Sequence, residues 1–140
     1  MSDLSTKHRK VENSVRSVLE GVSKIKLEHK RVKVAVSSIL PRYFNDQRKN
    51  ERFNMMRNRT NRLIHEGILK MNLQFMRDLE NAGTSFIDME PLIGTEMLTP
   101  DGVHLLRAGK DVFGARLCQW VVASSPRKER QKKNVPRNEE

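Results

Sequence analysis

Apolar side chains recur every three to four residues in three parts of the chain, and this spacing predicts three amphipathic helices. The first helix is expected over residues 8–29 and the last over residues 106–123. Their apolar stripes consist of Val11, Val15, Val18, Leu19, Val22 and Ile25, and of Val112, Phe113, Leu117, Trp120 and Val121. Between them, residues 48–81 are expected to be helical in two pieces. Gly67 is the expected bend, since glycine weakens a helix by about 1 kcal/mol relative to alanine.

The long middle segment carries two apolar stripes, one on each side of Gly67. They are Phe53, Met56, Leu63 and Ile64, and Ile68, Met71, Phe75, Met76 and Leu79. The sequence Asn81-Ala-Gly83 follows the second stripe and is typical of a helix C-cap. We therefore expect the second helical piece to extend to residue 81.

Two short apolar runs separate the expected helices and predict two β-strands. Residues 32–40 are rich in β-branched side chains and almost continuously apolar, which is typical of a parallel strand buried on both faces. Pro41 has no backbone N–H and ends this strand; residues 84–88 form the second. Strands that alternate with helices favour a parallel α/β layer with right-handed crossovers. Because two strands leave sheet edges and apolar faces uncovered, the chain is expected to be part of a larger fold.

Composition limits the chain to one domain with a modest core. It has 140 residues, of which 36% are hydrophobic and 31% charged. No apolar run approaches the roughly 18 residues of a membrane span, and the first residues lack the apolar core of a secretory signal. Cys118 is the single cysteine, so no internal disulfide can form. We expect a cytoplasmic or nuclear protein that uses no cofactor.

The net charge of +10 is concentrated in two segments. The basic residues between positions 42 and 62 are Arg42, Arg48, Lys49, Arg52, Arg57, Arg59 and Arg62. The second segment is the end of the chain, so the expected division is a domain over residues 1–124 and a basic disordered tail over residues 125–140. Such segments attract nucleic-acid phosphates through counterion release. The alternative is a solvated helix face followed by a tail without a partner.

The stretch from Leu98 to Leu117 carries the strongest candidate chemistry. A Pro-Asp-Gly turn places Asp101 three residues before His104 and leads into the last expected helix. A carboxylate and an imidazole in this relation can act as the orienter and the general base of a hydrolytic triad. The structural alternative is a turn in which Asp101 caps free backbone amides at the start of the helix.

Three pieces of the chain resemble the C-terminal part of the SGNH hydrolases, the GDSL-type esterase and lipase superfamily. The pieces are residues 34–42, residues 83–88 and residues 98–117, in the order and spacing of that family. The chain is most similar to the SGNH esterase-like domains in first open reading frames of non-LTR retrotransposons. The resemblance implies a partial flavodoxin-like three-layer α/β/α fold with a parallel sheet, in which the N-terminal strands are missing.

The resemblance also implies roles for individual residues. Asp101 and His104 correspond to the orienter and the general base in the last motif block of the family. The Gly-Asp-Ser block, which supplies the nucleophilic serine in the family, has no counterpart in this sequence. Asp3 and Leu4 match the end of the block that supplies the oxyanion asparagine, and Ser2 stands in place of that asparagine. The nucleophile and the oxyanion donors are therefore expected to be absent.

Other polar residues are weaker candidates. The serines on expected strands lack the exposed turn of a nucleophilic serine; they are Ser37, Ser38 and Ser85. The residues expected on the rim of the former active site are Arg42, Asp88 and Glu90. Cys118 is expected to be a small core residue. No metal site is expected, because no second ligand lies near any of the remaining histidines, His8, His29 and His65.

The sequence thus predicts an SGNH-type ester hydrolase domain that keeps its Asp-x-x-His block, lacks the serine block and is inactive alone. An ester would become a substrate only if an N-terminal half complemented the chain. The alternative is a basic nucleic-acid-binding accessory protein of retrotransposon origin, which binds through its basic segments. The oligomeric state is left open.

Overall fold

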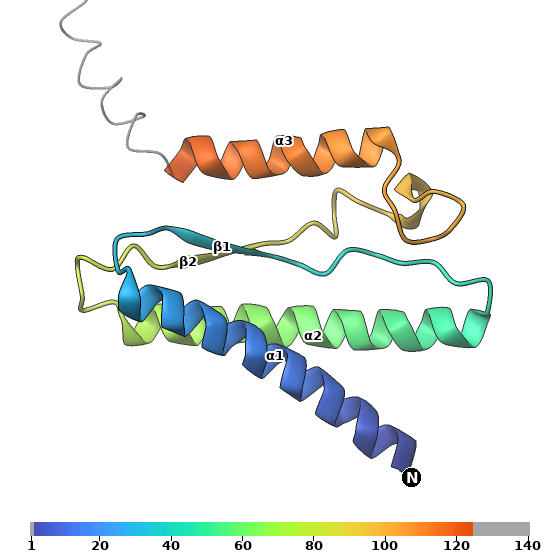
Figure 1. The fold of residues 1–140 in the computed structure, drawn as a ribbon, viewed down its shortest axis with the longest axis horizontal. Helices are drawn as coiled ribbons and strands as arrows, with labels where there is room; N and C mark the ends of the chain where they lie inside the picture. The colour runs from blue at the N-terminus through green and yellow to red at the C-terminus, as the bar shows by residue number, and fades with distance from the viewer. Residues whose placement is uncertain (1, 125–140) are drawn as a thin grey trace, which may run out of the picture.

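The computed structural model describes residues 2–124, and the basic tail expected over residues 125–140 lies outside that part (Figure 1). Helices and strands follow one another along the described chain as α1 (Ser2–Glu28), β1 (Val34–Ser37), α2 (Gln47–Gln74), β2 (Thr84–Ile87), the short 3-10 helix η1 (Thr95–Met97) and α3 (Arg107–Ser124). This order agrees with the prediction. The protein is of the mixed α/β class.

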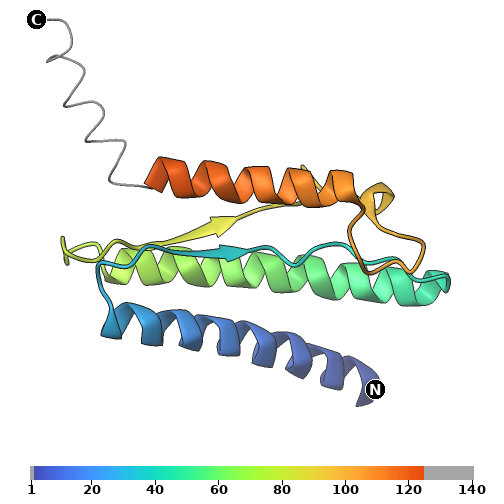
Figure 2. The same ribbon diagram turned by 45° about the horizontal axis from the view of Figure 1, so that its top comes forward.

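β1 and β2 pair in parallel, as predicted, and form a two-stranded sheet. A tight hairpin cannot join parallel strands, and the connection here is the 28-residue helix α2. The strands form a middle layer, with α3 over one face and α2 and α1 on the other side (Figure 1, Figure 2). The β1 side chains are half-buried rather than buried on both faces. A sheet of only two strands is too small to bury either strand completely.

The principal core lies between the sheet and α3. Its buried centre consists of Ile87, Met89 and Ile93, each no more than 2% exposed. The partly buried apolar side chains packed against this centre are Ala35, Leu40, Met97, Leu105, Val112, Phe113, Leu117 and Trp120. Most of the stripe predicted for α3 therefore faces the core. Val121 does not, and it remains exposed.

α2 is one continuous helix, so the predicted break at Gly67 is wrong. The side chain of Leu19 on α1 packs over Gly67, where a Cβ would overlap Cδ1 of Leu19. Glycine at this position permits the close approach of two helices. One turn further along, the Ser23 hydroxyl of α1 donates to Sδ of Met71 on α2 at 3.8 Å. The two helices therefore pack along a shared face.

The second half of α2 is shorter than predicted, since the helix ends at Gln74. Near this end, Asn72 supports β2: its side chain accepts from the backbone N–H of Thr84 at 3.0 Å and donates to the Thr84 carbonyl at 2.8 Å. Met76 and Leu79, expected in the apolar stripe, are 68% and 96% exposed because the chain has already left the helix.

The last buried side chain of α1 is that of Lys26 and not that of Ile25, which was predicted for this position. Ile25 is 42% exposed, whereas Lys26 is 1% exposed. The Lys26 ammonium donates to the carbonyl oxygens of Lys30 at 2.9 Å and Val32 at 2.6 Å. Burial lowers the pKa of Lys26 from its ordinary value, while the carboxyl end of the helix dipole favours a cation there. Lys26 thereby ties the turn before β1 to the end of α1.

The segments that follow β1 and β2 stay aligned through polar contacts. Ser38 N–H donates to the Ile87 carbonyl at 2.9 Å, and Met89 N–H donates to Ser38 Oγ at 2.9 Å. Asn61 on α2 accepts from the backbone N–H of Ile39 at 2.7 Å. Both segments therefore run on from the carboxyl ends of the strands toward the loop between η1 and α3 (Figure 1).

Candidate active site

The predicted catalytic residues lie on a closed loop between η1 and α3. Leu98 and Leu105 make an antiparallel bridge at the base of this loop. Within it, the backbone N–H of Thr99 donates to the His104 carbonyl at 2.7 Å. α3 begins only after the loop, at Arg107, so neither candidate residue is part of the helix.

The tip of the loop is anchored to the segment that follows β1. Gly102 has a φ of +74° and donates its N–H to the Thr99 carbonyl at 2.8 Å. Its own carbonyl accepts from the backbone N–H of Tyr43 at 2.8 Å. A Cβ at Gly102 would overlap the Tyr43 carbonyl oxygen, so both the backbone conformation and the close approach require glycine. This anchor sets the position of Asp101 and His104.

The side chains of Asp101 and His104 are in direct contact. His104 Nδ1 lies 2.5 Å from Asp101 Oδ2. Because an ionised carboxylate only accepts hydrogen bonds, the hydrogen lies on Nδ1 and the Nε2 of a neutral ring is left as an acceptor. The His104 side chain is 75% exposed and that of Asp101 48%. The pair can therefore present a carboxylate-oriented base to a molecule arriving from solvent.

Hydrogen bonds keep Asp101 ionised. Its donors are the Thr99 hydroxyl, Val103 N–H at 2.9 Å, the His104 ring and His104 N–H at 3.1 Å. Together they hold the pKa of Asp101 well below its ordinary range. The stability contributed by this carboxylate is therefore complete above the ordinary aspartate pKa of about 3.9. It is lost only as the pH falls through the lowered value.

The two oxygens of Asp101 have different partners. Oδ1 accepts from the Thr99 hydroxyl and from the backbone amides of Val103 and His104. Oδ2 faces the imidazole. The capping role considered from the sequence is thus present, although Asp101 caps the loop and not α3, and it leaves Oδ2 free to contact the imidazole.

The serines considered as nucleophiles lie elsewhere. Ser38 is 4% exposed, and its Oγ accepts a backbone N–H at 2.9 Å. Ser37 Oγ donates to the Ser38 carbonyl at 3.0 Å, and Ser85 lies within β2. Within the described part of the chain, the His104 ring forms a hydrogen bond with Asp101 alone. No described serine is therefore placed for activation by His104.

Two of the three predicted rim residues line a hollow of their own. Asp88 and Glu90 line a hollow of about 270 Å³ beside α2, together with His65 and Phe86. The lining of this hollow includes neither residue of the catalytic pair. The Arg42 guanidinium lies 4.6 Å from the centre of a phenyl ring, that of Phe44. Asp88 and Glu90 therefore line a hollow apart from the pair, whereas Arg42 precedes Tyr43, whose backbone N–H bonds to Gly102 in the loop.

Glu90 instead neutralises a buried cation on α2. The Arg57 side chain is 6% exposed, and both of its terminal nitrogens bond to the Glu90 carboxylate, with Nη2 3.2 Å from Oε1. Arg57 Nη1 also donates to the Ile39 carbonyl at 3.3 Å. Arg57 belongs to the basic segment expected to attract phosphates, but its burial removes it from that surface.

Cys118 is exposed on α3, so its predicted core position is wrong: it lies off the face that packs on the sheet.

Among residues 2–124, no group of three or more His, Cys, Asp and Glu side chains is placed to hold a metal ion. No helix of this part combines the length and the apolar character needed to cross a membrane. Comparison of the chain with known protein families, curated proteins and solved structures finds no match.

Replacing Gly102 with alanine is expected to lower the free energy of unfolding by about 2 kcal/mol or more, because the new Cβ meets the Tyr43 carbonyl at a positive φ. Gly114→Ala is the matched control. Nothing lies within 4 Å of its Cβ position, and alanine within a helix is expected to stabilise by up to about 1 kcal/mol. Urea unfolding followed by circular dichroism measures both, and equal stabilities would contradict the anchoring role of Gly102.

Proposed function

We propose that the chain is an SGNH-type hydrolase domain in which Asp101 and His104 form the base half of an ester-hydrolysing site. The observation that supports this most strongly is the 2.5 Å contact between His104 Nδ1 and Asp101 Oδ2 on an exposed loop. The parallel strand pair between helical layers is compatible with part of a flavodoxin-like fold. In such folds, ligands bind beyond the carboxyl ends of the strands, on the side of the molecule where this loop is anchored.

In the proposed mechanism, Asp101 is the orienter and His104 is the general base. Asp101 holds the Nδ1–H tautomer, so that Nε2 keeps a lone pair able to accept a proton. The proton comes from a hydroxyl or a water whose oxygen attacks the carbonyl carbon of the ester. The imidazolium, stabilised by the carboxylate, then returns the proton to the leaving alkoxide.

The proposed site is incomplete within the described residues, because no serine hydroxyl accompanies His104. A triad without its nucleophile retains only a small part of its rate, and one lost oxyanion donor costs a further factor of about 10²–10³. We therefore expect the pair alone to activate water slowly. Full activity would require a nucleophile from outside residues 2–124.

Hydrolysis of p-nitrophenyl acetate tests this proposal. We expect turnover of about 0.01 s⁻¹ or less, far below the roughly 10 s⁻¹ of a typical enzyme. His104→Ala is expected to abolish this residual rate because it removes the base. His65→Ala is the matched control, since His65 is an exposed histidine on α2 and is expected to leave the rate unchanged.

Two results would contradict the proposal. Equal residual rates in the His104→Ala and His65→Ala variants would show that the pair is not the base. Turnover in the ordinary enzyme range, together with labelling of a serine by a fluorophosphonate, would show that the site is complete.

A second candidate function is sequence-tolerant binding of nucleic acid. The first half of α2 and the segment before it present Arg42, Arg48, Lys49, Arg52 and Arg62 as exposed side chains. The ion pairs between lysine or arginine and carboxylates in the described part join Lys30 to Asp78, Arg31 to Glu80 and Arg57 to Glu90. The exposed cations of α2 are therefore left for phosphates, which supports this candidate.

Fluorescence anisotropy with a single-stranded RNA of mixed sequence checks the second candidate. The affinity is expected to fall steeply with salt, since each neutralised phosphate releases counterions. The double variant Arg48→Ala/Arg52→Ala is expected to bind more weakly. The slope of log affinity against log salt concentration is expected to become shallower by about one unit per lost phosphate contact. Arg77→Ala, an exposed arginine beyond α2, is the control. Affinity independent of salt would rule out this function.

A further inference from the structure

Exposed apolar side chains gather at one end of the molecule, the end at which all three helices finish (Figure 1, Figure 2). We call this the basal end. Within the described part, eight large apolar side chains are more than half exposed, and all but Met55 lie there. The seven on the last two turns of the helices or just beyond α2 are Leu27, Leu69, Leu73, Met76, Leu79, Val121 and Val122. Single exposed leucines are ordinary, but seven such side chains at one end indicate an interaction surface.

Polar contacts hold the parts of the basal end together. Lys30 Nζ lies 3.0 Å from Asp78 Oδ2, and the backbone N–H of Ala82 donates to the Lys30 carbonyl at 2.9 Å. The Lys33 ammonium donates to the carbonyl of Ser124, the last residue of α3. These contacts join the turn before β1, the turn before β2 and the end of α3. The exposed apolar side chains therefore belong to one region of the folded chain.

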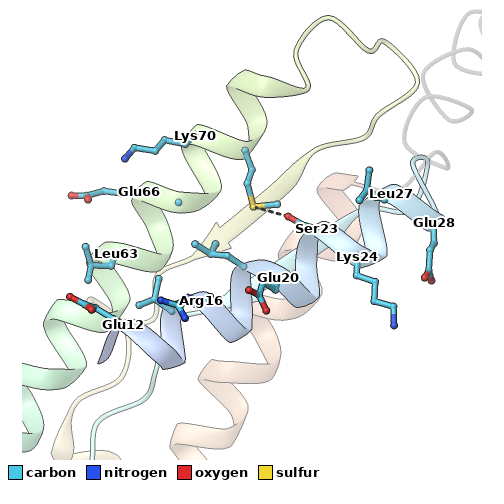
Figure 3. Close-up of a pocket in the computed structure, with 14 residues that line it drawn as sticks. Glu12, Arg16, Glu20, Ser23, Lys24, Leu27, Glu28, Leu63, Glu66 and Lys70 are labelled. Atoms are coloured by element: carbon cyan, nitrogen blue, oxygen red, sulfur yellow. Dashed lines mark hydrogen bonds between the residues drawn. The ribbon is translucent and has the colours of Figure 1, made fainter. Parts of the chain in front are cut away.

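The apolar side chains of the basal end protrude from separate elements. Leu79 is 96% exposed on the turn after α2. Leu27, on the last turn of α1, lies at one end of an open groove of about 740 Å³ between α1 and α2, with Lys24 nearby (Figure 3). A rigid protein partner would need a separate recess for each protruding side chain, whereas fluid acyl chains fit around any arrangement. This shape favours a lipid surface.

The charge of the basal end also favours a lipid surface. Its exposed basic side chains are Lys24, Lys30, Arg31, Lys33 and Arg77, and its carboxylates are Glu28, Asp78 and Glu80. Two of the three carboxylates are paired with a cation, at 3.0 Å for Asp78 and 3.8 Å for Glu80. The sequence that follows Ser124 adds six basic residues and three glutamates. The excess of positive charge is complementary to anionic headgroups.

We propose that the basal end docks on the surface of an anionic lipid bilayer. Leu73, Met76 and Leu79 enter the acyl boundary, and the basic side chains contact the headgroups. Apolar burial and charge act together, since a single weak attraction gives only marginal membrane binding. Docking leaves the loop of Asp101 and His104, at the opposite end of the strands, in water (Figure 1). The inference does not depend on ester hydrolysis by that pair.

A nucleic acid matches the basal end less well than a lipid surface does. Phosphates would engage its cations, but bases stack on aromatic rings and on guanidinium planes rather than on aliphatic side chains. RNA would therefore leave Leu73, Met76 and Leu79 in water. The contribution of these leucines to binding separates the two partners.

Cosedimentation of the full chain with vesicles tests the proposal. The wild type is expected to bind vesicles of equimolar phosphatidylcholine and phosphatidylserine at least about tenfold more tightly than vesicles of phosphatidylcholine alone. The double variant Leu73→Ser/Leu79→Ser is expected to bind the anionic vesicles about tenfold more weakly, because two leucines no longer leave water. Met55→Ser is the control, since Met55 is as exposed but lies in the first half of α2.

Charge reversal provides a second matched pair of variants. Lys24→Glu/Arg77→Glu is expected to weaken binding to the anionic vesicles by at least about tenfold. Arg48→Glu/Arg52→Glu changes the net charge equally, but at the start of α2, farther from the basal end than the roughly 10 Å over which charges act at moderate salt. It is expected to have little effect. Circular dichroism establishes that each variant keeps its helices.

Insertion is measured with brominated acyl chains, which quench tryptophan on contact. Leu79→Trp is expected to add quenched fluorescence to that of Trp120, whereas Met55→Trp is expected to add only unquenched fluorescence. A wild type that does not bind anionic vesicles would overturn the proposal. So would equal binding by the wild type and Leu73→Ser/Leu79→Ser, which would leave adsorption by cations alone, as on RNA. A wild-type dimer that this double variant abolishes without lipid would assign the surface to a second copy instead.

Discussion

The parallel pairing of β1 with β2 determines how the helices and the loop of the candidate site are arranged. A parallel pair needs a long connection, which α2 supplies, and both of its faces need cover, which α2 and α3 supply. Because both strands end on the same side, the chain segments that leave them run side by side. The hydrogen bond from Met89 N–H to Ser38 Oγ keeps these two segments aligned beyond the last paired residues of the strands. The loop between η1 and α3 is anchored on this extension.

The candidate chemistry follows from that anchor. Gly102 can meet the Tyr43 backbone only because it lacks a side chain, and the turn it completes places Asp101 and His104 in contact. One carboxylate oxygen then holds the loop while the other orients the imidazole. Local hydrogen bonds thus combine a structural role with the proposed orienting role in one residue. These hydrogen bonds leave Nε2 facing solvent, where the proposed reaction would require a nucleophile or a water.

The periodic parts of the fold were predictable from the sequence, because apolar spacing reflects which face of an element is covered. The three helices, the two strands and the face of α3 formed by Phe113, Leu117 and Trp120 are of this kind. Gly67 and Lys26 were not, since their environment is set by Leu19 on another helix and by carbonyls beyond the end of α1. The Asp101–His104 pair was found from its local spacing. The contacts of Gly102 with Tyr43 and of Arg57 with Glu90 join distant segments and leave no local signal.

The position of the hydrogen on the His104 ring decides whether Asp101 and His104 can act as orienter and general base. Nitrogen chemical shifts of His104, recorded by NMR under mildly alkaline conditions where imidazole is neutral, report which nitrogen carries the hydrogen. We predict the Nδ1–H tautomer in the wild type, with Asp101 as its acceptor, and a change toward Nε2–H in Asp101→Asn. An Nε2–H ring in the wild type, unchanged by Asp101→Asn, would contradict the assignment of Asp101 and His104 as orienter and general base.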